Sequence, residues 1–253
     1  SWTNDSEGPK ANKRLLMVAF LLGLGYANHP AGFLAAPAVG VAILIRRWQT
    51  WLDWRLVVKG LIVLSLGLTP FIYEPIRAAY FPRLNECEPT ACVDPIEATS
   101  PFSDLTKKRL MDKINREQYG QKLERVAPFT AQVGMWWLYF KWQWLRDAYN
   151  DSPALQAVLA VLFLGLGLIG GYVHWTKDRR TFWYFGPLMF TLTLALIYYM
   201  NFKYGWSQAP ELGDNVAREV RDRDYFYIWS YSAWGVWAAL GLVYVWQAVA
   251  ELI

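Results

Sequence analysis

PALQAVLAVLFLGLGLIGGYVHW, residues 153–175, contains no charged side chain over its whole length. A hydrocarbon core about 30 Å thick is crossed by a helix of about 20 apolar residues. Lipid offers no hydrogen-bond partner to backbone amides, so a segment of this kind must be helical within the bilayer. This stretch therefore predicts a membrane-spanning α-helix, and with it an integral membrane protein.

Three further stretches are similarly long and apolar: residues 56–73, 182–202 and 225–250. Lys59 is the one charged side chain within the four stretches. Of the 253 residues, 55% are hydrophobic and 17% aromatic, which suits a membrane bundle better than a soluble core. The expected fold class is all-α, a polytopic transmembrane helix bundle, and the simplest organisation is a single membrane domain over residues 1–253.

Residues 15–45 are also apolar, but Asn28, His29 and Pro30 interrupt them, and Pro37 follows. Proline lacks an amide hydrogen and disfavours helix at the residue before it, so a break near Asn28 is expected. The two halves would form about 20 Å and about 22 Å of helix, which is short for a span. We interpret residues 15–45 as a broken or re-entrant helix pair.

Basic residues lie on both sides of this pair: Lys10, Lys13, Arg14, Arg46, Arg47 and Arg55. The positive-inside tendency places both groups in the cytoplasm, which requires the pair to return to its own side. The following spans then alternate in direction. Residues 177–180 become a cytoplasmic turn, and residues 74–152 an extracytoplasmic loop.

The loop of residues 74–152 carries equal numbers of acidic and basic side chains. This balance indicates a folded, solvated surface, and the modest net charge of +4 also gives no nucleic-acid footprint. Residues 103–119 have capping residues and an apolar side that predict a helix. Residues 128–149 are rich in Trp and Tyr, and we interpret them as a helix lying in the membrane interface, with a further span as the alternative.

The two cysteines of the chain, Cys87 and Cys92, lie in this loop with no histidine nearby. A disulfide in an oxidising compartment and two unpaired thiols are both compatible with the spacing, whereas structural zinc usually needs four ligands. The whole chain contains only two histidines. Haem- or metal-centred chemistry draws on imidazole or thiolate ligands, so no cofactor and no metal are expected.

Asn28 and His29 are functional candidates because a polar side chain at membrane depth needs a partner or a water-filled cavity. A capped helix end near the interface is the alternative. His174, close to the end of its span, is interpreted as a boundary residue whose polar tip reaches the interface. Gly167 and Gly171 are four residues apart, a spacing that permits close helix packing.

The densest charged cluster beside a span is REVRDRDYFY, residues 218–227. Arginine binds phosphate through two parallel hydrogen bonds, and a nearby carboxylate can orient it or accept a proton. A membrane-boundary belt of self-neutralising ion pairs is the alternative. Candidate contacts for a lipid phosphate or substrate are Arg221, Arg223, Asp224 and Tyr225, with Glu74, Arg77 and Arg116 as further candidates.

Five pieces of the chain, taken together and in order, resemble a bacterial multi-spanning membrane family once labelled a domain of unknown function. The pieces are GLGYANHPAG (23–32), YEPIRAAYFPRLNECEPT (73–90), NREQYG (115–120), WWLYFKWQW (136–144) and VRDRDYFYIWSYSAWG (220–235). That family is related to the transmembrane protein O-mannosyltransferases of the GT-C superfamily. The chain resembles its middle-to-late portion, without the upstream part that carries the family's first acidic loop.

The resemblance implies a bacterial inner-membrane transferase, with residues 74–152 on the periplasmic side. Such an enzyme takes a sugar from a polyprenyl-phosphate donor and attaches it to a hydroxyl group, using a carboxylate base and cations that hold the phosphate. No catalytic residue is assigned in this chain. The alternative is a noncatalytic accessory subunit of a larger respiratory, photosynthetic or transport complex. The expected partners are membrane lipids, a polyprenyl-phosphate sugar and other membrane protein subunits, and no nucleic acid.

Overall fold

The computed structural model describes residues 7–74, 76, 103–104, 107–108, 111–112, 125–145, 152–200, 203–219 and 221–252. They belong to two compact units. The first unit includes Leu34–Gln49 and Glu124–Ile253, and the second is Glu7–Phe33 with Thr50–Leu123. Hydropathy does not mark this division, because both units are built from apolar helices. Four candidate residues lie outside the described residues: Arg77, Cys87, Cys92 and Arg116.

The described residues are mainly helical and contain no strand beyond an isolated bridge between Tyr204 and Arg218. Within them, four segments are long and apolar enough to cross a membrane: Pro30–Trp51, Pro153–Lys177, Arg179–Met200 and Asp224–Ala250. The predicted fold class, an all-α polytopic helix bundle, is therefore confirmed. The chain is an integral membrane protein by the length and apolarity of these helices.

Three of the four segments overlap the expected spans at residues 153–175, 182–202 and 225–250. The first expected span, residues 56–73, differs, because it is divided between helix α3 (Trp54–Gly67) and a 3-10 helix, Thr69–Ile72. Pro70 has no amide hydrogen with which to continue α3. The candidate span nearest the N-terminus is instead Pro30–Trp51, which contains α2 (Ala36–Arg47).

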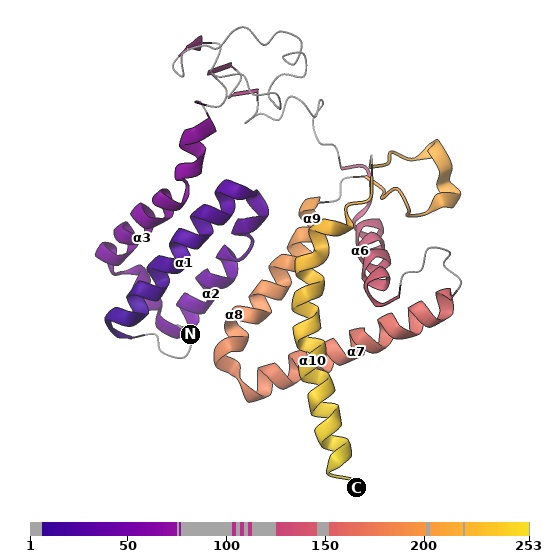
Figure 1. The fold of residues 1–253 in the computed structure, drawn as a ribbon. Coiled ribbons are helices and arrows are strands. Elements are labelled where there is room, and N and C mark those ends of the chain that lie inside the picture. The colour runs from indigo at the N-terminus through magenta and orange to yellow at the C-terminus, as the bar shows by residue number, and fades with distance from the viewer. Residues whose placement is uncertain are drawn as a thin grey trace. The chain divides into compact units, whose positions relative to one another are not determined.

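The second unit is built on the packing of α1 (Gly8–Asn28) against α3 (Figure 1). Glycines allow the two backbones to meet: a Cβ atom at Gly23 would lie 2.2 Å from the Leu64 carbonyl oxygen, and one at Gly67 would lie 2.4 Å from the Phe20 carbonyl oxygen. Helix α1 ends at Asn28, where the sequence predicts a break. Whether the following chain re-enters the membrane stays a prediction.

The core of the first unit lies between α6 (Phe129–Trp144), α8 (Arg179–Phe190) and α10 (Ile228–Ala250), with α9 (Leu196–Met200). A π-helical segment, Thr191–Ala195, joins α8 to α9. Helix α6 forms where the sequence predicts an interfacial helix, but Met135, Tyr139 and Phe140 are at most 1% exposed. Trp136 and Tyr139 of this helix therefore pack in the core of the unit, and the location of the helix in the membrane interface stays a prediction.

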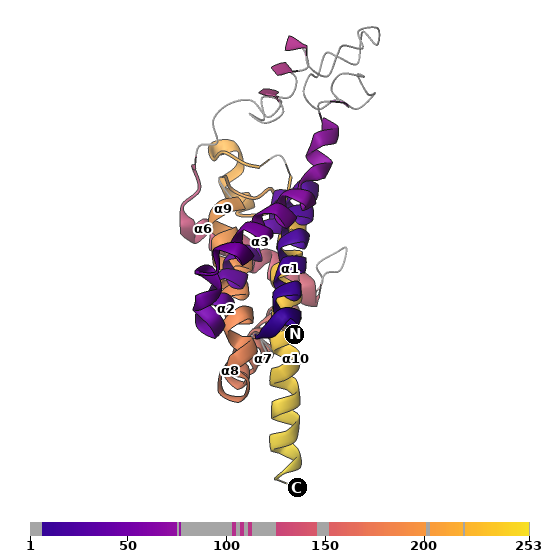
Figure 2. The same cartoon turned by 90° about the vertical axis from the view of Figure 1, so that its left-hand side faces the viewer.

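Helix α7 (Pro153–Lys177) crosses α10 in the first unit (Figure 1). Three glycines lie at the crossing: Gly167, Gly170 and Gly241. Cβ atoms at Gly170 and Gly241 would lie 1.7 Å from the Trp237 carbonyl oxygen and 2.0 Å from the Leu166 carbonyl oxygen. Beyond the crossing, α10 continues past the turn between α7 and α8 (Figure 2), and its residues 242–250 are all exposed.

A chain of hydrogen bonds fixes the turn between α7 and α8. The Trp237 indole N–H donates to Nδ1 of His174 at 3.2 Å, and Nε2 of His174 lies 2.7 Å from the Thr181 hydroxyl. That hydroxyl donates to Oδ2 of Asp178 at 2.6 Å. Consistent donor directions along this chain place the histidine proton on Nε2. His174 thus joins α7, α8 and α10, a structural role beyond that of a boundary residue.

Asp178 caps α8, and we expect its carboxyl group to make the stability of the protein depend on pH. The hydrogen bond from the Thr181 hydroxyl holds the pKa of the Asp178 carboxyl below its usual range, although desolvation opposes this. Because folding favours the carboxylate, its stabilising effect is complete above the unfolded pKa of about 3.9 and is lost as the pH falls through the lower folded value. Asp178→Asn is expected to lower the thermal midpoint in detergent at pH 7, and the difference from wild type should shrink in acid. An equal difference at both pH values would contradict this cause, and Asp214→Asn in an exposed loop is the control.

Candidate functional site

The candidate site is built on the loop of residues 203–227, which connects α9 to α10. The loop closes on itself where the Tyr204 amide donates to the Ala217 carbonyl at 3.1 Å and the Glu219 amide donates to the Tyr204 carbonyl at 2.8 Å. It ends in a short 3-10 helix, Asp224–Tyr227, which leads directly into α10. Charged side chains of this loop are therefore held at the beginning of the candidate span Asp224–Ala250.

Arg218 holds the loop together from inside. Its guanidinium group donates to five backbone carbonyl groups, at distances from 2.7 to 3.4 Å: those of Gly205, Trp206, Gln208, Ala209 and Gly213. A guanidinium has five N–H donors in a fixed plane, so these contacts occupy most of its capacity. Arg218 is a structural residue of the loop, and the positive charge available to a ligand must come from other side chains.

Asp222 joins the loop to α6. Oδ1 accepts hydrogen bonds from the Tyr139 hydroxyl at 2.9 Å and the Ser207 amide at 3.1 Å, and Oδ2 accepts one from the Ser207 hydroxyl at 2.5 Å. Burial, and then the hydrogen bond to Asp222, raise the pKa of Tyr139 above its ordinary value. Tyr139 therefore remains a protonated donor at neutral pH. Sequence reasoning missed the contact between these two residues, because they are 83 positions apart.

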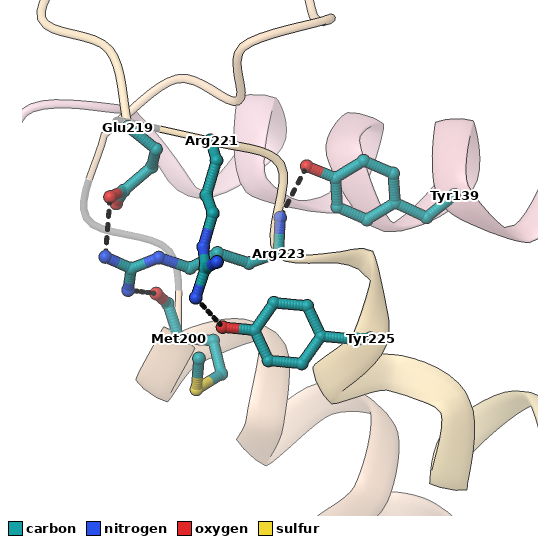
Figure 3. Close-up of polar contacts among 6 residues, drawn as sticks. All are labelled: Tyr139, Met200, Glu219, Arg221, Arg223 and Tyr225. Carbon is teal, nitrogen blue, oxygen red and sulfur yellow. Dashed lines mark hydrogen bonds and ion pairs between the residues drawn. The ribbon is translucent and has the colours of Figure 1, made fainter.

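Arg223 is engaged in an ion pair inside the loop (Figure 3). Its Nη2 lies 2.8 Å from Oε2 of Glu219, and its Nη1 donates to the Met200 carbonyl at 3.5 Å. The Glu219 side chain is only 8% exposed, while that of Arg223 is 32% exposed. This contact has the self-neutralising form that the sequence left open as the alternative reading of the cluster. Glu219 was not a candidate, although its spacing of four residues from Arg223 is typical of a local ion pair.

Arg221 and Tyr225 form the exposed part of the site. Nη2 of Arg221 donates to the Tyr225 hydroxyl at 3.3 Å, and the guanidinium carbon lies 5.5 Å from the centre of the same ring (Figure 3). Among the described residues Arg221 forms no ion pair. Its remaining N–H donors can therefore bind an anion, and the aromatic ring holds the guanidinium in place.

The structure brings Arg221, Arg223, Asp224 and Tyr225 together on one loop, as their proximity in sequence predicts. Asn28 and His29 lie in the second unit, where His29 ends α1: its amide donates to Gly25, and its Nδ1 accepts from the Ala31 amide at 3.1 Å. These contacts support the interpretation of His29 as the cap of a helix end. Asn28 lines an open apolar groove of about 490 Å³ together with Leu21, Leu24, Gly25, Ala27 and Pro70.

Glu74 is described, but its predicted neighbour in the site, Arg77, is not. The part of the chain that the structure describes holds no group of three or more His, Cys, Asp or Glu residues suited to a metal ion. The chemistry that the described loop can perform is anion binding. Arg221 supplies the accessible charge, Tyr225 supports it, and Glu219 and Arg223 on either side of Arg221 form an ion pair with each other.

A comparison with family models gives one match. The model of the protein O-mannosyl-transferase TMEM260 N-terminal domain matches residues 1–52, about a fifth of the chain. This match supports a relation to protein O-mannosyltransferases in that segment. No curated protein and no solved structure matches the chain. The loop of residues 203–227 lies outside the matched segment, so the family relation and the site rest on independent observations.

Proposed function

We propose that this chain is a glycosyltransferase-like membrane protein that binds a polyprenyl-phosphate sugar, with Arg221 and Tyr225 as contacts for the phosphate. The observation that carries this proposal is the exposed Arg221 guanidinium, 3.3 Å from the Tyr225 hydroxyl at the beginning of a candidate span. A phosphate attached to a long isoprenoid must lie at the membrane surface while its hydrocarbon tail lies in lipid. A cation at the end of an apolar helix matches both requirements.

The matched segment and the membrane helices give independent support for this class of protein. The proposal includes membership of the GT-C superfamily, a bacterial inner membrane as the location, and residues 74–152 on the periplasmic side. Under the predicted topology, the loop of residues 203–227 faces the same side. Arg223 then acts as a positioning residue, because its guanidinium is held by Glu219 and Met200.

Binding of polyprenyl phosphate to the purified full chain in detergent tests the phosphate site. We expect saturable binding, and an affinity about 10-fold lower for Arg221→Ala, because one charge-assisted contact is lost. Arg55→Ala is a matched control: the Arg55 guanidinium lies 5.6 Å from the Trp54 ring centre, a similar arrangement in the other unit. The absence of saturable binding, or equal affinities for wild type and Arg221→Ala, would contradict the proposal. Transfer of mannose from polyprenyl-phosphate mannose to a hydroxyl acceptor tests the catalytic part separately.

An accessory subunit is the second candidate, with the exposed end of α10 as the surface that a partner would cover. Leu242, Trp246 and Val249 in this end are 55%, 74% and 48% exposed. A neighbouring membrane subunit would cover such a surface as well as lipid does. Co-purification of a defined membrane subunit from native membranes, together with no binding of polyprenyl phosphate, would support this role over the transferase.

A further inference from the structure

We infer that the turn between α7 and α8 binds the headgroups of anionic phospholipids through Lys177, Arg179 and Arg180. This site is separate from the loop of residues 203–227 and goes beyond the proposed function. Its location follows from its neighbours: Pro153–Lys177 and Arg179–Met200 are both candidate spans, with only Asp178 between them. A connection of one residue between two membrane-crossing helices must lie at a membrane surface.

The three cations of this turn are exposed and form no ion pair within the described residues. Asp178 is the one acidic residue of the turn, and its two oxygens already accept hydrogen bonds from the backbone amides of Arg180 and Thr181 and from the Thr181 hydroxyl. The same contacts occupy the amides of Arg180 and Thr181 in the first turn of α8. An external anion would therefore bind the basic side chains rather than the end of the helix.

Arg179 and Arg180 occupy the first turn of α8, where positive charges add to the helix dipole instead of compensating it. An external anion offsets this cost. The Arg179 guanidinium lies 4.9 Å from the centre of the Trp175 ring, which packs edge-on against Trp183 at 5.4 Å. Tryptophan is enriched at the level of lipid headgroups. A headgroup bearing a phosphate and a net negative charge is the ligand that this combination fits.

The turn is also fixed before any lipid binds. The hydrogen bonds from Trp237 through His174 and Thr181 to Asp178 connect it to α10. A site that needs no ordering on binding retains more of its interaction free energy as affinity. Helix α2, which packs against α8, also ends in two basic residues, Arg46 and Arg47, which adds positive charge to the same unit.

Native mass spectrometry of the full chain with phosphatidylglycerol and with phosphatidylcholine tests the inference. We expect wild type to prefer phosphatidylglycerol. The triple variant Lys177→Gln, Arg179→Gln, Arg180→Gln should bind it about 100-fold more weakly, from the contribution of each basic residue near an anionic surface. Arg179→Lys, Arg180→Lys retains the charges and should stay within about 3-fold of wild type, which separates loss of charge from loss of fold.

The control is the triple variant Lys10→Gln, Lys13→Gln, Lys59→Gln, which removes the same charge from three exposed lysines of the other unit. Equal losses in the two triple variants would overturn the inference, because net charge alone would then explain binding. No preference of wild type for phosphatidylglycerol would also overturn it. Competition by inorganic phosphate at equal concentration would identify a site for free phosphate instead of lipid. Arg221→Ala should retain the wild-type preference for phosphatidylglycerol over phosphatidylcholine, so failure here is distinguishable from failure of the polyprenyl-phosphate site.

Discussion

Gly170→Val is expected to lower the free energy of unfolding by more than about 3 kcal/mol, the upper end of the usual range for overpacking. A Cβ atom at this position would lie 1.7 Å from the Trp237 carbonyl oxygen and 2.8 Å from the Gly241 amide nitrogen. Both atoms belong to the backbone of α10 and cannot rotate away as a side chain would. The two helices must therefore separate, which removes the close contacts on which helix association in a membrane depends.

The matched control for this prediction is Gly165→Val on the same helix. A Cβ atom at Gly165 would meet nothing within 4 Å, and valine has a somewhat higher helix propensity than glycine. We expect this variant to stay within about 0.5 kcal/mol of wild type, as for other substitutions at unconstrained positions. Unfolding in mixed detergent, followed by circular dichroism, measures both variants. Similar midpoints for the two would show that the crossing tolerates a side chain.

Glycine spacing in α7 predicts part of this crossing. The pair Gly167 and Gly171 correctly indicated the packing face of α7, because small residues four apart share one side of a helix. The contact with the α10 backbone, however, is made by Gly170, while a Cβ at Gly167 would meet the Trp234 ring and one at Gly171 the Trp237 ring. A spacing rule identifies a face, but the crossing point depends on the partner helix.

The membrane helices were predictable to a similar degree. Apolar length predicted membrane helices at residues 153–175, 182–202 and 225–250, and three candidate spans of the structure overlap these stretches. It also predicted one helix over residues 56–73, whose apolar count is high although α3 ends at Gly67 and Pro70 lies in the 3-10 helix that follows. Average hydropathy does not detect that Pro70 lacks the amide hydrogen that a continuous helix needs.

For the loop of residues 203–227, the sequence predicted which charges gather but not what each does. Arg218, Arg221 and Arg223 have the same chemistry and lie within six residues of one another. Their roles differ through their contacts: carbonyl groups of residues 205–213 for Arg218, the Tyr225 hydroxyl for Arg221, and the Met200 carbonyl for Arg223. The pairs Glu219–Arg223 and Arg221–Tyr225 had a local signal, because the two residues of each pair are four positions apart.

Arg218→Met is expected to lower stability by about 3 kcal/mol and to unfold the loop locally, because five carbonyl groups lose a charged donor. Hydrogen bonds to charged groups contribute about 1.5–3 kcal/mol each when well shielded, and the expected loss is smaller than their sum because Arg218 is only partly buried. Hydrogen exchange of amides 203–217 is the direct measurement. Faster exchange confined to this stretch is the expected result.

Two further variants separate the geometry of Arg218 from its charge. Arg218→Lys keeps the charge, but an ammonium group lacks the planar fork that reaches carbonyls on both sides, so most of the loss should remain. Arg221→Met removes an arginine three residues away that makes one side-chain hydrogen bond, to Tyr225, and should leave exchange in the loop near wild type. If Arg218→Lys restored full protection, charge alone would hold the loop. The distinction between a structural Arg218 and a ligand-binding Arg221 would then fail, and with it the reason for choosing Arg221 as the phosphate contact.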